Sequence, residues 1–167
     1  MSRRSILRKV SRMLKKHLTP DKLYVDCSFF VATQITNHPH HKRSSKLLQL
    51  LPDVQLYFSL LTIDEIMYTL SKFNIPRKEI FSIITDKIIG IQNTRIINYN
   101  NSIAQLESYV KIWNDTGMQP RDALHACLMK THNIPCIATF DRDFRKIEKN
   151  LGIEVLTLKI AQGVTGL

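Results

Sequence analysis

The stretch YVDCSFF (Tyr24–Phe30) changes from a strand pattern to a helix pattern within a few residues. The apolar run Leu23–Asp26 predicts a buried strand, and a helix is predicted from about Ser28 to Ile35. A buried strand that passes straight into a helix is typical of a parallel sheet with helical crossovers. Asp26 therefore lies at the carboxyl end of its strand, the edge at which such sheets bind ligands.

The rest of the chain repeats this alternation of short apolar runs and amphipathic segments. Further strands are predicted over Val54–Leu60, Thr94–Ile97, Ile134–Ala138 and Ile153–Leu156. Further helices are predicted over Lys42–Leu51, Ile63–Phe73, Pro76–Gly90, Asn100–Trp113, Pro120–His132 and Phe144–Lys149. The pattern predicts an α/β fold, a three-layer α/β/α sandwich with a mostly parallel central sheet.

The composition is that of one globular domain, predicted to span residues 22–158 and to be followed by a short tail, residues 159–167. The chain has 167 residues, of which 44% are hydrophobic and 23% charged. No apolar run reaches the ~18 residues of a membrane-spanning helix. Three scattered cysteines without a CxxC pair argue against a disulfide framework, which favours a reduced, cytoplasmic setting.

The net charge of +10 is concentrated near the N-terminus. Residues 1–19 hold seven of the 24 Lys and Arg residues and no acid, which leaves 17 basic and 14 acidic residues in the remainder. Ile6, Val10 and Met13 recur at helical spacing, so a basic amphipathic arm is predicted, ending at Thr19-Pro20-Asp21. Four roles stay open: packing against the domain, binding nucleic acid, contact with a membrane surface, or targeting.

Four acidic side chains are predicted to meet at the carboxyl edge of the sheet. Asp26 closes the first strand, where it has no helix of its own to begin. Glu65 lies in the first turn of the helix after the second strand, and Asp122 lies in the first turn of its own helix. Asp141 follows the strand Ile134–Ala138 by three residues. Taken singly, Glu65 and Asp122 are more simply explained as residues that stabilise a helix N-terminus.

Taken together, these acids point to a divalent-metal site. Burying carboxylates beside apolar runs is energetically unfavourable unless a cation binds them. Mg²⁺ and Mn²⁺ prefer oxygen ligands, and such ions activate water and stabilise the leaving oxygen when a phosphodiester is cleaved. The joint pattern therefore predicts a metal-dependent enzyme that acts on phosphodiester bonds.

The four contexts VDCSFF, DEIMYTL, RDALHA and TFDRDF, in this order, resemble those of the PIN-domain nucleases. Within that family the chain is most similar to the VapC-type toxins of prokaryotic toxin–antitoxin pairs. The resemblance covers about Lys22 to Leu158. It implies a three-layer α/β/α fold around a parallel sheet and metal-dependent cleavage of RNA.

The resemblance also implies roles for individual residues. The catalytic, metal-binding positions, for Mg²⁺ or Mn²⁺, are Asp26, Glu65, Asp122 and Asp141, with Asp143 as an auxiliary metal ligand. Ser28 and Thr139 occupy positions where the family often has supporting hydroxyl groups.

Three arginines beside the acidic edge, Arg121, Arg142 and Arg145, are expected to hold RNA phosphates. The expected partners are RNA, a cognate antitoxin protein and a second copy of the chain in a homodimer. Residues 1–19 are not part of a minimal toxin, so a PIN-fold RNA-processing factor and a non-catalytic RNA- or protein-binding module stay open. A HAD-type phosphatase is disfavoured, because its DxDx[TV] motif has x-Asp where this chain has Cys27-Ser28.

Histidines form two further features. His38, His40 and His41 lie in a polar loop with no cysteine at zinc spacing, so a solvated loop is favoured over a zinc site. His125 lies about one helical turn after Asp122 and either faces the acidic edge or packs in the core. Packing is the favoured interpretation.

Overall fold

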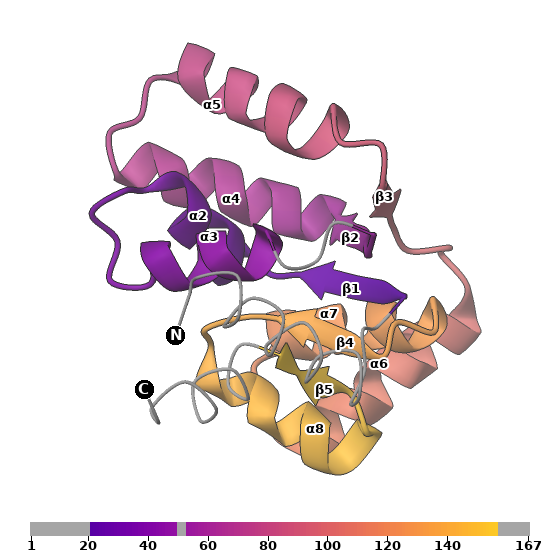
Figure 1. The fold of residues 1–167 in the computed structure, drawn as a ribbon. Helices are drawn as coiled ribbons and strands as arrows, with labels where there is room; N and C mark the ends of the chain where they lie inside the picture. The colour runs from indigo at the N-terminus through magenta and orange to yellow at the C-terminus, as the bar shows by residue number, and fades with distance from the viewer. Residues whose placement is uncertain (1–20, 50–52, 157–167) are drawn as a thin grey trace, which may run out of the picture.

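Strand β1 (Lys22–Val25) lies at the centre of a five-stranded sheet with the order β3-β2-β1-β4-β5 (Figure 1). The computed structural model describes residues 21–49 and 53–156, so the predicted arm and tail lie outside the described residues. Every neighbouring pair of strands in this part of the chain is parallel. The other strands are β2 (Gln55–Ser59), β3 (Thr94–Ile97), β4 (Cys136–Ala138) and β5 (Glu154–Val155), and β3 and β5 form the two edges.

Helices cover both faces of the sheet, which confirms the predicted three layers (Figure 1). One layer consists of α2 (Cys27–Gln34), α3 (His41–Gln49), α4 (Leu60–Lys72) and α5 (Arg77–Ile84). The other consists of α6 (Ile103–Thr116), α7 (Pro120–Thr131) and α8 (Arg145–Leu151), with the short 3₁₀-helix η2 (Arg142–Phe144).

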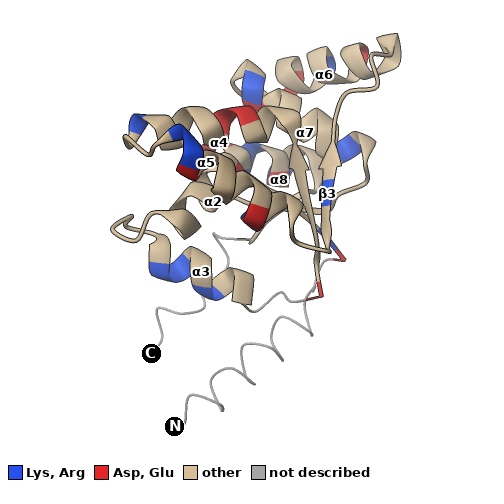
Figure 2. Ribbon diagram, turned by 90° about the horizontal axis from the view of Figure 1, so that it is seen from above, with Lys and Arg blue, Asp and Glu red and all other residues tan. Residues whose placement is uncertain are grey.

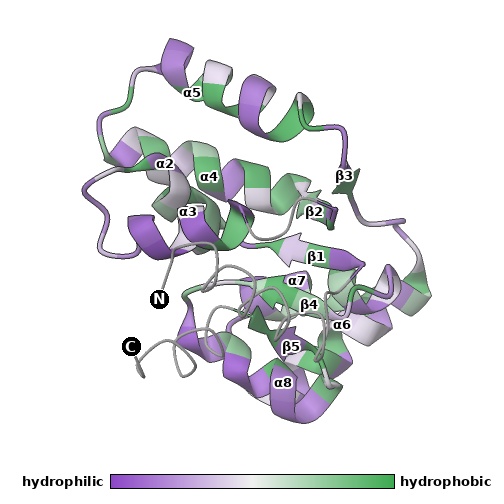
Figure 3. Ribbon diagram, in the orientation of Figure 1, coloured by the Kyte–Doolittle hydropathy of each residue, from purple (hydrophilic) through white to green (hydrophobic). Residues whose placement is uncertain are grey.

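The alternation of side chains along the strands creates two cores. Leu23 and Val25 of β1 pack in the core that contains α2 and α4, whereas Tyr24 packs in the core that contains α7. Figure 3 shows mixed hydrophilic and hydrophobic residues along the outer helices α5 and α8. No helix in the part of the chain that the structure describes has the length and hydropathy to cross a bilayer.

Two of the corrections to the predicted helix starts concern the site. Helix α4 starts at Leu60 rather than Ile63, because the Ser59 hydroxyl accepts a hydrogen bond from the Thr62 amide and caps the helix. Glu65 therefore lies in the second turn, not the first. Asp26 does begin a helix, contrary to the prediction, because its carboxylate accepts a hydrogen bond from the Ser28 amide and caps α2.

The segment Pro76–Gly90 is not one regular helix as predicted. Helix α5 passes into a π-helical turn, η1 (Thr85–Ile89), which ends at Gly90. A Cβ atom on Gly90 would lie 3.1 Å from the carbonyl oxygen of Asp86 and 3.2 Å from that of Thr85. The wide π turn brings these carbonyls close to residue 90, which favours glycine at the end of the segment.

The remaining boundaries differ by a few residues. Helix α6 starts later than predicted, because Ser102 caps it, and it ends at Gly117, whose φ of 60° suits glycine. Strand β4 is shorter than the predicted Ile134–Ala138, and Pro135, which has no amide hydrogen, directly precedes it. Helix α7 begins with Pro120, and β3 has its predicted bounds.

Candidate active site

The four predicted carboxylates line a single cleft of about 700 Å³. Asp26 follows β1, Glu65 is on α4, Asp122 is on α7 and Asp141 follows β4. Ser28, Arg121 and His125 line the same cleft. Of the other predicted residues, Thr139, Asp143, Arg142 and Arg145 are not among those that line it.

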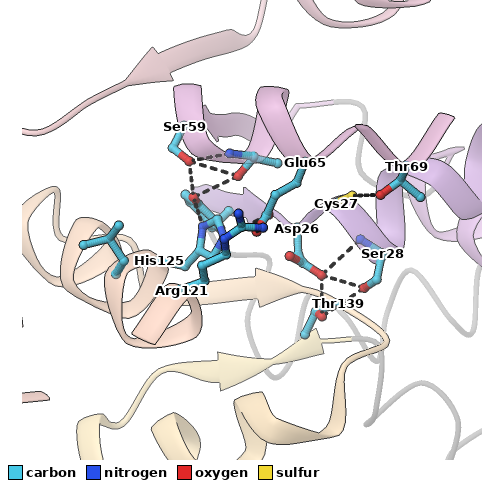
Figure 4. Close-up of polar contacts among 12 residues, drawn as sticks. Asp26, Cys27, Ser28, Ser59, Glu65, Thr69, Arg121, His125 and Thr139 are labelled. Carbon is cyan, nitrogen blue, oxygen red and sulfur yellow. Dashed lines mark hydrogen bonds and ion pairs between the residues drawn. The ribbon is translucent and has the colours of Figure 1, made fainter. Parts of the chain in front are cut away.

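Asp26 is held rigidly. It is 6% exposed, and its Oδ2 accepts hydrogen bonds from the Ser28 hydroxyl at 2.5 Å and the Thr139 hydroxyl at 2.8 Å (Figure 4). Thr139 also accepts a hydrogen bond from the Asp141 amide at 2.9 Å. The two hydroxyls therefore link the loops that follow β1 and β4 and fix the orientation of the Asp26 carboxylate.

Glu65 lies between a cation and an imidazole. Its Oε1 is 3.8 Å from Nη1 of Arg121, and its Oε2 is 3.1 Å from Nε2 of His125 (Figure 4). The side chain of His125 is only 2% exposed. His125 is thus packed, as favoured from the sequence, but it also faces the acidic edge.

Asp26, Glu65 and His125 form the one group of three or more potential metal ligands found within residues 21–49 and 53–156. One ligand atom from each lies within 4.8 Å of the others. A donor set of carboxylate oxygens and one imidazole nitrogen fits a divalent cation such as Mn²⁺ or Mg²⁺.

The buried partners of His125 were not predicted from the sequence. Its Nδ1 lies 2.7 Å from the hydroxyl of Tyr24, which in turn contacts the hydroxyls of Ser59 and Thr62. Tyr24 is fully buried, and burial raises the pKa of its phenol far above the ordinary value. A strand tyrosine resembles any apolar strand residue in sequence, whereas Ser59 and Thr62 could have been found as a helix-capping pair three residues apart.

Asp122 experiences the negative charge of the cleft. Burial, followed by the charge of Asp141 and more weakly of Asp26 and Asp143, raises the pKa of its carboxyl to about 6, while His125 opposes this shift. A carboxyl whose pKa is raised by neighbouring carboxylates is typical of a functional site that binds positive charge.

Asp141 and Asp143 differ in their surroundings. Asp141 caps η2, and its Oδ1 accepts a hydrogen bond from the Asp143 amide at 2.8 Å. The Asp143 carboxylate is 48% exposed and lies 3.8 Å from Nζ of Lys146. Asp141 lines the cleft, and Asp143 lies beside it.

Histidines and aromatic residues form other parts of the cleft wall. His38 and His40 line it, and the His40 ring stacks on Phe140 with ring centres 4.2 Å apart, so these histidines are not simply a solvated loop. Tyr68 and Phe73 also line the cleft and are 60% and 49% exposed. Helix α3, which begins directly after His40, carries three basic residues and no acid (Figure 2).

Comparisons with known proteins agree with the motifs. The family model described as PIN domain matches residues 23–150. Among solved structures, the chain is similar to the Mycobacterium tuberculosis toxin VapC20, described as cleaving the sarcin-ricin loop. The TM-score is 0.58 at 19% identity, over 74% of this chain and 92% of that chain, a similarity of fold. No curated protein matches the chain.

Proposed function

Because the chain belongs to the PIN domain family, we propose that it is a ribonuclease that depends on Mg²⁺ or Mn²⁺ and acts as the toxin of a toxin–antitoxin pair. The observation that carries this proposal is the joint presence of Asp26, Glu65, Asp122 and Asp141 in the lining of one cleft. None of the four family positions carries a neutral substitute. The site therefore keeps the negative charge that a divalent cation requires.

Each carboxylate has a defined part in this proposal. Asp26, Glu65, Asp122 and Asp141 would hold the cation, with Asp143 as an auxiliary ligand, and Ser28 and Thr139 keep Asp26 in place. When bound, the cation supplies charge that stabilises the leaving oxygen and lowers the pKa of the attacking water. In the metal-free cleft the carboxyl of Asp122 has a pKa of about 6, so near neutral pH it is mostly ionised and available to the cation.

Positive and aromatic side chains support RNA as the substrate. Arg121 lies in the cleft beside Glu65, and Arg142 and Arg145 on the neighbouring segment are available for phosphates. The exposed rings of Tyr68 and Phe73 provide surfaces on which unpaired bases can stack. Unpaired bases occur in single strands and loops, and the similar toxin VapC20 is described as cleaving the sarcin-ricin loop. Single-stranded or looped RNA is the proposed substrate class.

A cognate antitoxin and a second copy of the chain are the proposed protein partners. An apolar stripe on α6 supports a contact of this kind: Ile103, Leu106, Val110 and Trp113 are between 46% and 77% exposed at helical spacing. Cys27, Cys127 and Cys136 are thiols, which agrees with the proposed cytoplasmic setting. The basic residues 1–19 favour the alternative of a PIN-fold RNA-processing factor.

The test is cleavage of single-stranded and hairpin RNA by the purified protein in Mg²⁺, in Mn²⁺ and in EDTA. Cleavage is expected only with metal, and Asp26→Asn and Asp122→Asn should each abolish it, because they remove a charged ligand at constant size. Asp115→Asn is the matched control, since Asp115 is an acid on α6 that pairs with Lys111 and does not line the cleft.

Two results would contradict the proposal. Cleavage that persists in EDTA, or in both cleft variants, rules out the metal mechanism. RNA that is bound but never cut in either metal identifies a non-catalytic binding module instead.

A further inference from the structure

Three buried hydroxyl groups form a closed ring next to His125. The Tyr24 oxygen lies 2.7 Å from Ser59 Oγ and 3.0 Å from Thr62 Oγ1, and the latter two are 3.0 Å apart. Three hydroxyls carry three protons, so all three contacts are hydrogen bonds only if every proton stays within the ring. A buried contact between two oxygens without a proton is unfavourable, which favours the closed ring.

The ring determines which nitrogen of His125 carries a proton. Because Tyr24 donates its single proton to Ser59, its oxygen can only accept from Nδ1 of His125, 2.7 Å away. Nδ1 is therefore protonated, and in the neutral imidazole Nε2 carries the lone pair. Nε2 is the nitrogen that faces Glu65 (Figure 4).

In the neutral imidazole the lone pair of Nε2 faces negative charge. Nε2 lies 3.1 Å from Glu65 Oε2, and Asp26, Glu65 and His125 each offer a ligand atom within 4.8 Å of the other two. Two acceptor atoms at 3.1 Å repel one another unless a proton or a metal cation lies between them. Histidines that bind metals normally use their second nitrogen for a hydrogen bond that fixes the ring, as Nδ1 of His125 does with Tyr24.

We propose that Nε2 of His125 is a ligand of the divalent cation together with Asp26 and Glu65, and that this nitrogen makes the site select Mn²⁺ over Mg²⁺. The inference rests on the proposed metal-dependent function and extends it, since it names a non-acidic ligand and the preferred ion. Mg²⁺ demands oxygen ligands and loses its waters reluctantly, whereas imidazole is a common ligand of transition-metal ions.

A second role for His125 is compatible with the same ring. As an imidazolium that only positions Glu65, His125 would donate from Nδ1 to Tyr24 and from Nε2 to Glu65, with the three hydroxyl contacts intact. The two roles differ in whether nitrogen is bonded to the metal, which is measurable.

The experiment is pulsed electron paramagnetic resonance of Mn²⁺ bound to the full chain, which detects ¹⁴N directly bonded to the ion. The wild-type protein should show one imidazole ¹⁴N coupling, and labelling with ¹⁵N-histidine should replace it with the ¹⁵N pattern. The wild type should also bind Mn²⁺ about tenfold or more tightly than Mg²⁺, measured by displacement of Mn²⁺. His125→Asn should remove the coupling and reduce this ratio, and His132→Asn, near the end of the same helix, should change neither.

Bound Mn²⁺ without nitrogen coupling in the wild type would overturn the proposal, as would failure of Mn²⁺ to bind. The wild-type spectrum tests the ligand role of His125 even if the His125→Asn variant does not fold. RNA cleavage on the same samples separates the two proposals: cleavage without nitrogen coupling leaves the ribonuclease function standing. Nitrogen coupling without cleavage supports the ligand role and contradicts the ribonuclease function.

Discussion

Asp122 is the residue at which the charge of the cleft is most directly measurable. Its carboxyl has a pKa of about 6, raised first by burial and then by Asp141. Between its ordinary value of 3.8 and about 6, the folded state binds more protons at Asp122 than the unfolded state does. The contribution of Asp122 to the free energy of unfolding therefore falls as the pH rises through this interval and stays low above it.

We predict that Asp122→Asn raises the melting temperature of the metal-free protein at pH 7 and removes this part of its pH dependence. Thermal melts in EDTA between pH 4 and pH 8 measure the effect. Excess Mn²⁺ should raise the melting temperature of the wild type more than that of Asp122→Asn, because a cation offsets the repulsion among the carboxylates. An Asn variant with the same pH profile as the wild type would show that Asp122 is not destabilised by its neighbours.

Single residues also show where sequence reasoning ends. The positions of Asp26 and Asp122 followed from strand and helix ends, because parallel strands bring their carboxyl ends to one edge. The second contact of His125 did not follow, since it depends on a hydroxyl of Tyr24, 101 residues away in the chain. Helical spacing placed His125 near Asp122 but could not decide whether its ring met carboxylates or aliphatic side chains.

At the scale of elements, α4 connects stability with the site. Ser59 caps the helix and also belongs to the hydroxyl ring that orients His125, so one residue serves the fold and the cleft. The predicted start of α4 at Ile63 was wrong. The spacing of apolar residues indicates which face of a helix is buried, but the capping hydroxyl of Ser59 is not part of that apolar pattern. The strand and helix types were predictable, since each has its own hydrophobic period.

We predict that Ser59→Ala lowers the free energy of unfolding by about 1–2 kcal/mol, through the lost cap and the broken ring. It should also reduce RNA cleavage. Ser102→Ala is the matched control, since Ser102 caps α6 in the same way and does not line the cleft. Urea unfolding should show a loss of about 1 kcal/mol for Ser102→Ala with cleavage unchanged. Equal cleavage by the two variants would contradict the role of the ring.

At the scale of the whole molecule, positive charge is distributed unevenly along the chain. Residues 1–19 hold seven basic residues, whereas the remainder carries 17 basic and 14 acidic ones. Within the described chain, α3 presents three bases next to the loop of His38 and His40 (Figure 2). The overall fold was predictable because strand–helix alternation allows few arrangements, but charge alone does not specify how RNA enters the cleft.

We predict that deletion of residues 1–19 weakens RNA binding and flattens its dependence on salt, because phosphate contacts release counterions. Cleavage at saturating RNA should remain, since the proposed catalytic groups all lie outside this segment. Fluorescence anisotropy at several salt concentrations measures the affinity for RNA and its dependence on salt. Unchanged affinity with an unchanged salt slope would show that the arm does not contact RNA, and loss of solubility would point to packing against the domain.

RNA cleavage in this cleft is expected to require a divalent cation. The most direct measurement is the single-turnover cleavage rate of a hairpin RNA in a titration of the EDTA-treated protein with Mn²⁺, with bound Mn²⁺ measured on the same samples. Rate and occupancy should rise together in the wild type, and the rate should stay at background in Asp26→Asn. A full rate in the metal-free protein, or a rate that does not follow occupancy, would contradict the requirement for the cation.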